Sequence, residues 1–404
     1  MAQGFFCGRP AAGENLKMNT KRNTILAYAY SFAAWFGITN LWVIYLGQQG
    51  LPLIQIGLCE SIFHVASFCF EVPSGMLADR FSYKTVLYFS RIMAIISSLL
   101  MLIGHSFIWF AISFIVSAWS YNLQSGTLEA LAYESLPQAS RDARYAKVVS
   151  MISIVTEVGS TAGVIIAGAL VHWHFEITYY ISIVLGIVAL GTIAFMQEPS
   201  VHGPREQRQT LAMIVRAAVH ELRHQPVLRN LMLLDAVIST AGTAFYYYFQ
   251  DVMTKADFAG WMISTLMLVS SLGSIAAMRA LPWLQAKTSQ LQLLLGITVA
   301  MTFALIVIAV PSMVAMIVMY LIIQAITAVM YPLFNAYYNE LIPSKQRATL
   351  LSVASMLFSV VMIVLFPVCG WLVDRFSFNV TFGGFGLVLL LATIGWAVRQ
   401  KRAA

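Results

Sequence analysis

The chain has 404 residues, of which 59% are hydrophobic and only 10% are charged, and its net charge is +7. Soluble domains carry about a quarter charged residues, and disordered chains are rich in charge and poor in aromatic residues, so the composition excludes both classes. Four cysteines are also too few for a secreted disulfide scaffold. The sequence therefore predicts an all-α integral membrane protein.

Twelve apolar segments follow one another along the chain, each long enough for a bilayer core that needs about 20 residues per helix. They lie at 23–48, 52–79, 84–104, 107–134, 146–172, 176–197, 228–252, 257–281, 289–310, 312–341, 347–373 and 377–397. The polar stretch 198–226 separates two sets of six. We therefore expect a tail at 1–22, a six-helix half at 23–197, a cytoplasmic linker at 198–226, and a second six-helix half with a short tail at 227–404. The linker is expected to carry one amphipathic helix, which either lies on the membrane surface or packs as a connector.

The positive charges give this layout an orientation. Nearly all lysines and arginines fall on one side of the membrane; only Lys255 and Arg375 fall on the other, and Arg91 lies within a segment. Because positive loops remain in the cytoplasm, both termini are expected there, in a cell membrane of the bacterial cytoplasmic type. The same placement accounts for the basic balance, so no nucleic-acid partner is expected. We expect a monomer whose partners are the lipid bilayer and a small-molecule substrate.

The second segment carries polar side chains on one helical face. They recur at spacings of 4, 3, 4 and 3 and are Glu60, His64, Ser67, Glu71 and Ser74. At 3.6 residues per turn, this spacing confines them to a stripe about 80° wide, which could line an aqueous path. Glu71 and Arg91 lie at similar depths, and an unpaired charge at that depth is costly, so we expect these two to form a structural ion pair.

The loop after the second segment reads Gly75-Met-Leu-Ala-Asp79-Arg80-Phe-Ser-Tyr-Lys84. It resembles the signature G-x-x-x-D-R-x-G-R-K/R of the major facilitator superfamily, with Ser and Tyr in place of the usual Gly and Arg. The resemblance implies a conformational latch in which Gly75, Asp79, Arg80 and Lys84 act in gating. Asp79 is expected to accept hydrogen bonds from a neighbouring helix N-terminus.

Two acidic residues near the same end of the fourth segment, Glu129 and Glu134, fit this gating network. We expect them to pair with Arg80, Arg141 or Arg144. The resemblance covers essentially the whole chain at the level of topology, and it implies transport by alternating access of two halves.

An internal repeat supports two halves of the same orientation. Four matches occur in the same order at nearly constant offset. They pair Glu134-Ser-Leu-Pro with Glu340-Leu-Ile-Pro, Ser150-Met with Ser355-Met, Gly168-Ala-Leu-Val with Gly370-Trp-Leu-Val, and Phe175-Glu-Ile-Thr with Phe378-Asn-Val-Thr. The repeat predicts twelve transmembrane helices arranged as two parallel six-helix repeats, and the resemblance implies that this fold class is the major facilitator fold.

The fifth segment carries Gly159-Ser-Thr-Ala-Gly163-Val-Ile-Ile-Ala-Gly168. It resembles the antiporter motif g-x-x-x-G-P-x-x-G-G, with Val and Ala replacing a Pro and a Gly. It reads equally well as a small-residue face for helix packing. Asn122 stands where drug exporters of the superfamily carry an arginine, which is a departure from the drug:proton antiporter branch that the chain otherwise resembles.

The resemblance also places the first, fourth, seventh and tenth helices around a central cavity. The tenth segment presents a stripe at spacings of 4, 3, 4, 4 and 3 that ends at Tyr338. The expected cavity residues are Trp35, Asn40, Tyr121, Asn122, Ser125, Ser239, Tyr246, Gln250, Tyr320, Gln324, Thr327, Tyr331 and Asn335. A lining rich in aromatic rings and poor in hydrogen-bonding groups, with one or two acids, suits a mostly apolar substrate, and it could also accept a cationic one.

Acidic residues at membrane depth are candidates for carrying a coupling proton. Glu157 is the first candidate because it lies near the midplane of the fifth segment, followed by Glu60, with His64 on the same face, and then by Asp235. Each of them could instead be a satisfied structural group. No nucleotide-binding motif or metal-site spacing occurs, so no cofactor is expected besides the proton.

These observations favour a secondary transporter that exports small, largely hydrophobic, drug-like compounds in exchange for protons. Two alternatives remain, a proton-coupled symporter for a nutrient solute and a lipid translocase. A membrane-embedded enzyme is disfavoured because the sequence shows no nucleophile–base or metal constellation.

Overall fold

The computed structural model describes residues 12–137, 141–199, 223, 225–342 and 347–403, and these residues form helices and connecting loops without any strand. The first half contains α1 (Ala12–Ala34), the 3-10 helix η1 (Gly37–Thr39), α2 (Trp42–Gln48), α3 (Leu53–Arg80), α4 (Tyr83–Ile103), α5 (Phe107–Gln124), α6 (Thr127–Glu134), α7 (Arg141–Leu170) and α8 (Ile177–Phe195). The second half contains α10 (Pro226–Lys255), α11 (Gly260–Lys287), α12 (Gln290–Val307), α13 (Met313–Leu341), α14 (Arg347–Arg375) and α15 (Phe378–Ala403).

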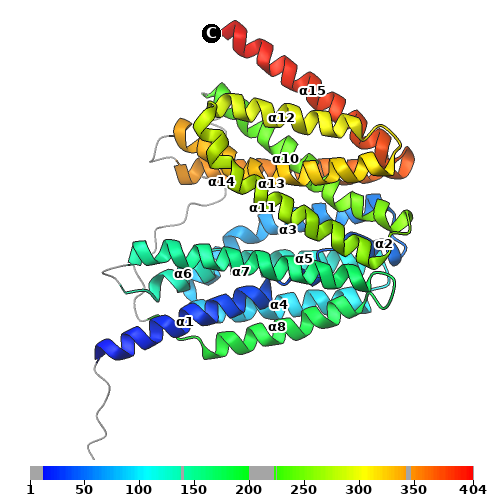
Figure 1. Cartoon of the computed structure of the whole chain (residues 1–404). Coiled ribbons are helices and arrows are strands. Elements are labelled where there is room, and N and C mark those ends of the chain that lie inside the picture. The colour runs from blue at the N-terminus through cyan, green and yellow to red at the C-terminus, as the bar shows by residue number, and fades with distance from the viewer. Residues whose placement is uncertain (1–11, 138–140, 200–222, 224, 343–346, 404) are drawn as a thin grey trace, which may run out of the picture.

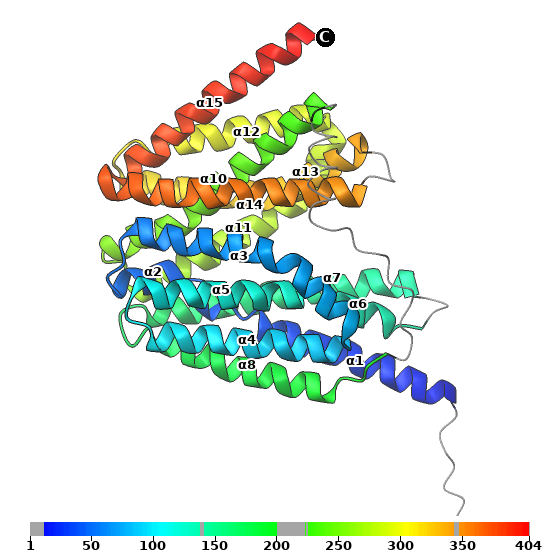
Figure 2. The same cartoon turned by 180° about the vertical axis from the view of Figure 1, so that it is seen from behind.

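The two halves form two helical bundles that lie against each other, with the long helices roughly aligned (Figure 1, Figure 2). The start of α1 and the end of α15 lie at the same end of the molecule. We call this end the terminal side and the end that holds α2 the opposite side.

The lengths of the helices fit a bilayer. Among the described residues, nine helical stretches are long and apolar enough to cross a membrane, and Phe378–Leu391 in α15 forms a shorter apolar stretch. Helix α5 has 18 residues and α10 has 30, and both run between the same two sides. The predicted all-α membrane fold is confirmed, and the helices are consistent with twelve crossings.

Most helix ends lie within a few residues of their predicted positions, but two predicted segments are not continuous. The segment 23–48 is divided into α1, η1 and α2, and the segment 107–134 is divided into α5 and α6. Gly126 separates the latter two with a φ of 75°, a left-handed conformation that glycine adopts without a Cβ penalty. Helix α1 begins at Ala12, inside the predicted tail, and the predicted linker helix lies almost wholly outside the described residues.

The contacts between the halves show the internal symmetry. Helix α3 packs along α14, and α7 packs along α11. In a parallel repeat of six helices, α3 corresponds to α11 and α7 corresponds to α14. The contact of α3 with α14 is therefore equivalent to the contact of α11 with α7. A pseudo-two-fold axis between the halves relates the two contacts.

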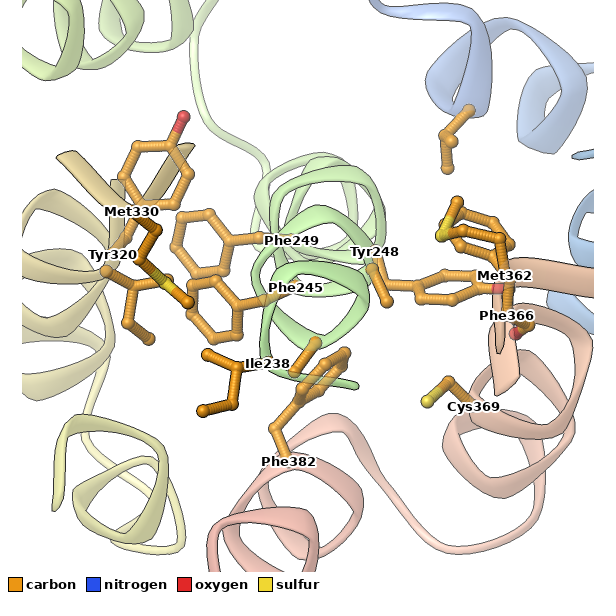
Figure 3. Packing of buried hydrophobic residues seen from close by; sticks show 14 of the residues in the cluster. Ile238, Phe245, Tyr248, Phe249, Tyr320, Met330, Met362, Phe366, Cys369 and Phe382 are labelled. Atoms are coloured by element: carbon orange, nitrogen blue, oxygen red, sulfur yellow. Dashed lines mark hydrogen bonds between the residues drawn. The ribbon is translucent and has the colours of Figure 1, made fainter. Parts of the chain in front are cut away.

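The second half has a tightly packed aromatic core around α10 (Figure 3). The rings of Phe245 and Phe249 are stacked with centroids 5.7 Å apart, and Phe249 stacks on Tyr320 at 4.9 Å. On another side of α10, the Tyr248 hydroxyl donates to the carbonyl of Phe366 at 2.8 Å. In lipid such packing and hydrogen bonding, rather than exclusion from water, hold helices together.

Candidate functional site

Two cavities of about 400 Å³ each lie in or beside the first half. The bundle cavity lies among α1, η1, α3, α4, α5 and α8, and its lining includes Trp35, Thr39, Asn40, Trp42, Glu60, Phe63, Arg91, Phe114, Tyr121, Gln124, Tyr179 and six serines. The interface cavity lies between α3, α5 and α14, and is lined by Phe63, His64, Ser67, Phe68, Glu71, Gly75, Tyr121, Asn122, Ser125, Ser355, Met356, Phe358 and Ser359. Phe63 and Tyr121 line both cavities.

Glu60 and His64 form a close pair of titratable groups between the two cavities. The His64 Nε2 atom lies 3.5 Å from Glu60 Oε1, one helical turn away on α3, and both side chains are largely buried. Glu60 lines the bundle cavity, whereas His64 lines the interface cavity. The ring of His64 also meets Phe358 of the second half, with centroids 6.0 Å apart. The predicted stripe thus places two titratable groups at the contact between the halves.

Aromatic rings form the walls where the two cavities approach each other. The rings of Trp35 and Tyr121 meet edge to face at 6.2 Å, and Tyr121 meets Phe63 at 6.1 Å. Trp35 is 41% exposed and Tyr121 is 47% exposed, so both rings are open to a ligand. Their edges and faces offer a mainly apolar contact surface.

Asn122 and Ser67 join α5 to α3 by a reciprocal pair of hydrogen bonds. The Ser67 hydroxyl donates to Asn122 Oδ1 at 2.8 Å, and the Asn122 amide donates to the Ser67 carbonyl. Both residues and Ser125 line the interface cavity, as expected for the fourth segment. Asn40 lines the bundle cavity and donates to the Ser160 hydroxyl at 3.1 Å.

The expected ion pair between Glu71 and Arg91 is wrong. Glu71 is exposed and lines the interface cavity, whereas Arg91 is buried, 7% exposed, and points into the bundle cavity. The guanidinium donates instead to the side chain of Gln124 and lies 5.5 Å from the ring centre of Tyr30. Counting along two helices gives equal depths, but the direction of each side chain depends on how each helix is rotated.

The cavity residues expected on α10 and α13 have different surroundings from those predicted. Tyr320 is fully buried, and its hydroxyl donates to the Met267 sulfur at 3.1 Å, so it belongs to the packed core (Figure 3). Gln250 is also fully buried and donates to the carbonyl of Asn40 at 3.2 Å. The assignment of these two residues to the cavity is therefore corrected.

Other members of the predicted lining of the second half are partly accessible. Tyr246, Gln324, Thr327 and Asn335 are half-buried, while Tyr331 is exposed. The hydroxyl of Thr327 donates to the carbonyl of Ile323 in its own helix at 2.8 Å.

The other two acidic candidates differ in their partners. Asp235 accepts from the Tyr338 hydroxyl at 2.7 Å and from the Ser239 hydroxyl at 2.9 Å, so it ties α10 to α13. Glu157 on α7 is exposed and lies within electrostatic range of the Tyr246 hydroxyl in the other half. Neither lines the two cavities described above.

The predicted gating loop is held by a residue that the sequence analysis did not single out. Glu198 accepts from the backbone N–H of Tyr83 at 2.7 Å and of Lys84 at 3.1 Å, and thereby caps α4. The Lys84 ammonium donates to the carbonyl of Met196 at 2.7 Å. The side chain of Asp79, which was expected to cap a helix, lies outside the described part of the chain.

The expected ion pairs of Glu129 and Glu134 are not formed. Among the described side chains, neither carboxylate reaches Arg80, Arg141 or Arg144 within 4.0 Å. Glu134 accepts from the Tyr83 hydroxyl at 2.9 Å. The guanidinium of Arg141 lies over the ring of Tyr133. In the predicted gating loop, Gly75 lines the interface cavity and Arg80 is exposed.

The three glycines of the antiporter-like motif make close backbone contacts. A Cβ at Gly163 would lie 2.4 Å from the backbone of Gly37, and one at Gly159 would lie 3.2 Å from Phe32. A Cβ at Gly168 would lie 2.5 Å from the Ser264 hydroxyl of α11. The first two therefore allow α7 to approach α1 and η1, and the third allows it to approach the other half.

Contacts close the gap between the halves on the opposite side. The Asp374 carboxylate accepts from the backbone N–H of Ile54 at 3.0 Å, and the Ser61 hydroxyl donates to the carbonyl of Ile363 at 2.8 Å. The ring of His172 is hydrogen-bonded to the carbonyl of Phe258. The interface cavity begins beyond these contacts, toward the terminal side.

Sequence reasoning missed the serines of the bundle cavity. Ser97 pairs with Ser113 at 2.9 Å and Ser98 with Ser182 at 3.1 Å, so they link α4 to α5 and α8. Ser113, Ser117 and Ser120 recur on α5 at spacings of 4 and 3, a stripe that could have indicated them from the sequence, whereas the pairing of the serines across helices needs the structure. They make this cavity more polar than the aromatic lining that we expected.

The chain resembles known membrane transporters over nearly its full length. A sequence profile of the Major Facilitator Superfamily matches residues 24–364 and 292–404. The uncharacterized MFS-type transporter YxaM of Bacillus subtilis (strain 168) is 22% identical over 394 residues, which cover 92% of this chain and 95% of that protein.

Solved structures of transporters share the fold. A mutant of the nucleoside transporter NupG has a TM-score of 0.76 at 16% identity, covering 92% of this chain and 99% of that one. A bacterial homolog of the human lysosomal transporter Spinster, inward-facing and unoccupied, has a TM-score of 0.69 at 14% identity, with 96% of each chain covered. A mutant of the peptide transporter POT in complex with alafosfalin has a TM-score of 0.67 at 14% identity, covering 99% of this chain and 96% of that one.

Proposed function

Because this chain belongs to the Major Facilitator Superfamily and is a membrane transporter of that type, we propose that it exports small, largely hydrophobic compounds in exchange for protons. The two halves alternate in exposing the cavities to either side of the membrane. Proton coupling, direction and substrate class are the parts of this proposal that experiment must test.

One observation carries the proposal, namely the position of the Glu60–His64 pair. The pair lies between the two cavities, and His64 contacts Phe358 of the second half. Opening the contact between α3 and α14 would change the surroundings of His64 and its access to water. A proton bound to the pair would therefore be coupled to the movement of the halves.

The aromatic walls support a largely hydrophobic substrate. Trp35, Tyr121 and Phe63 line the bundle cavity, the latter two also line the interface cavity, and rings of this kind bind apolar groups over a large area. Sugars need a denser set of hydrogen-bonding groups, which makes them poorer candidates.

The orientation in the membrane follows from the positive charges, and it indicates to which side of the membrane the interface cavity opens. With both termini in the cytoplasm, the closed opposite side faces the exterior, and the interface cavity faces the cytoplasm. This arrangement fits a transporter that is ready to load from the cytoplasm, as an exporter is at the start of its cycle.

Transport is measured in liposomes that contain a pH-sensitive dye. A pH gradient is imposed, and lipophilic cations, neutral drugs, hydrophobic acids, sugars and amino acids are added in turn. We expect a hydrophobic compound to dissipate the gradient in the native protein. Glu60→Gln is expected to abolish this response, because it removes the carboxylate that pairs with His64.

The chain offers a matched control in a second His–Glu pair. His174 and Glu176 lie 3.2 Å apart on the opposite side, but their side chains are 62% and 49% exposed. Glu176→Gln is expected to leave transport unchanged because that pair lines neither cavity. A response to sugars or amino acids alone would support the symporter, and movement of a labelled lipid without proton flux would support the lipid translocase.

Glu157 is the competing coupling residue. We expect Glu157→Gln to keep proton coupling, because Glu157 is exposed and forms no ion pair among the described residues. If Glu157→Gln abolishes proton flux while Glu60→Gln retains it, the coupling role belongs to Glu157 and the assignment to Glu60 is wrong.

A further inference from the structure

We propose that Arg91 is an anion-binding subsite of the bundle cavity that takes the carboxylate of a small, largely hydrophobic organic acid. The inference rests on the proposed function and narrows its substrate class. It concerns equilibrium binding, so it can be tested separately from proton coupling.

Arg91 is a buried cation whose nearest partners are neutral. It is 7% exposed, and no carboxylate of the described residues lies within 4.0 Å of its guanidinium. Its Nη2 atom donates to the Gln124 side chain and to the Ser90 hydroxyl at 3.3 Å, while Nη1 donates to the carbonyl of Ala34 at 3.4 Å. The Nε atom is buried without a hydrogen-bond partner within the described chain.

A charge in these surroundings is costly. Ionised side chains at membrane depth are usually paired with an opposite charge, and those without such a pair commonly bind a ligand or an ion. A ligand carboxylate would neutralise the guanidinium, and planar arginine matches the two oxygens of a carboxylate.

Many of the other polar groups of the cavity already have partners. Most of its serines pair with one another across helices, including Ser97 with Ser113 and Ser98 with Ser182. Glu60 lies beside His64. Arg91 is therefore the cavity group that combines a full charge with an unused donor.

The same cavity accommodates the rest of the proposed ligand. Its volume of about 400 Å³ is within the usual range for small-molecule sites. Trp35, Trp42 and Phe114 line it together with Arg91, and the rings of Trp42 and Phe114 meet at 5.1 Å. An acid with an aromatic or branched apolar part fits both the cation and these rings.

A purely structural role for Arg91 is the competing explanation. Arg91, Gln124 and Tyr30 link α4, α5 and α1, and the Tyr30 hydroxyl donates to Gln124 Oε1 at 3.0 Å. Glu129 also acts electrostatically on Tyr30 and is the acidic residue that could balance Arg91 at longer range. A structural role predicts no preference among ligands, which separates the two explanations.

The test is calorimetric binding to the purified full-length protein in lipid nanodiscs. The probes share one ring and differ in charge, and they are 3-phenylpropionate, 3-phenylpropionamide and 2-phenylethylamine. The native protein is expected to bind the acid about tenfold to a hundredfold more tightly than the amide, since hydrogen bonds to charged groups are worth about 1.5–3 kcal/mol.

Variants then assign the preference to Arg91. Arg91→Gln is expected to remove the preference for the acid while the amide binds as before, and Arg91→Lys is expected to retain part of it. Arg375→Gln removes an exposed arginine on the opposite side and is expected to change nothing. Glu129→Gln is expected to preserve or strengthen binding of the acid.

Three results overturn the proposal. These are equal binding of the acid and the amide to the native protein, no binding of the acid at millimolar concentration, and an undiminished preference in folded Arg91→Gln or Arg91→Lys. Binding of the acid that depends on Arg91, without any proton movement in liposomes, would leave the subsite standing and refute the coupling. Proton-coupled transport together with acid binding that does not depend on Arg91 would support the coupling and refute the subsite.

Discussion

Asp235 and Glu60 are carboxylates at membrane depth whose neighbours give them different roles. Asp235 accepts two hydrogen bonds from Tyr338 and Ser239, and all three residues belong to the second half. Glu60 lies beside His64, which is itself titratable and touches the other half. A carboxylate held by two donors within one rigid bundle is a structural tie, whereas one beside a histidine at a moving contact can exchange a proton with it.

Asp235→Asn is expected to lower stability without removing proton coupling. The substitution replaces one acceptor oxygen by an amide, so a buried hydroxyl loses its partner at a cost of about 1–3 kcal/mol. The measurement is thermal unfolding in detergent, together with the proton flux of the same preparation. Asp251→Asn is the control, because Asp251 pairs with Lys255 one helical turn away in its own helix and therefore does not tie α10 to α13. A variant that keeps its stability but loses proton flux would return Asp235 to the coupling role.

At this scale the sequence predicts which residues are unusual but not what they touch. The stripe on α3 is correct as a face, and it brings Glu60 and His64 together. The Glu71–Arg91 pair is wrong because side-chain direction depends on helix rotation. Glu198, which is distant in sequence, accepts from the first backbone N–H groups of α4, and spacing alone could not indicate this contact.

Helix ends follow local chemistry, and helix breaks follow tertiary contacts. Ser289 and Gln292 form a reciprocal capping box at the start of α12, and Ser82 caps α4. These signals lie in the sequence, and the predicted ends agree with the structure to a few residues. The break after α1 has another cause, because Gly37 must approach α7 so closely that a Cβ would lie 2.3 Å from the carbonyl oxygen of Ser160.

Gly163→Ala is expected to destabilise the packing of α7 against η1. A Cβ at Gly163 would lie 2.4 Å from backbone atoms of Gly37 and Ile38, which cannot rotate away. Overpacking of this kind costs about 1–3 kcal/mol. Gly191→Ala on α8 is the control, since nothing lies within 4 Å of its added Cβ and alanine is the better helix former by about 1 kcal/mol. The two variants are compared by thermal unfolding, and equal midpoints would contradict the close contact between α7 and η1.

The two halves make corresponding helix contacts, but their predicted cavity stripes have different surroundings. The repeat in the sequence predicts the two halves, and the paired contacts of α3 with α14 and α7 with α11 agree with it. The repeat does not predict that Tyr320 and Gln250 are buried, because a stripe of polar residues suits a cavity and a packed hydrogen-bonded core equally well. Aromatic stacking around Phe245 fills that region of the second half (Figure 3).

Two native cysteines report on closure of the opposite side. Cys59 is fully buried on α3 and Cys369 is 2% exposed on α14, the two helices that meet across the halves. In a state open on the opposite side these helices separate there, and the thiols become accessible to water. Cys69 is exposed in the present state, so it is replaced by serine together with Cys7 before the measurement.

Asp374→Ala is expected to increase the reaction of these two thiols with a water-soluble maleimide. The Asp374 carboxylate accepts from the backbone N–H of Ile54 in the first turn of α3, and therefore caps that helix from the other half. Losing a cap costs about 1 kcal/mol, which raises the population of the state open on the opposite side about fivefold. Glu176→Ala is the control, because that exposed carboxylate lies on the same side of the molecule beside His174 within the first half. The hydrogen bond exists only in the state closed on the opposite side, so Asp374→Ala destabilises that state alone. An unchanged maleimide reaction rate in Asp374→Ala would show that this contact does not hold the halves together.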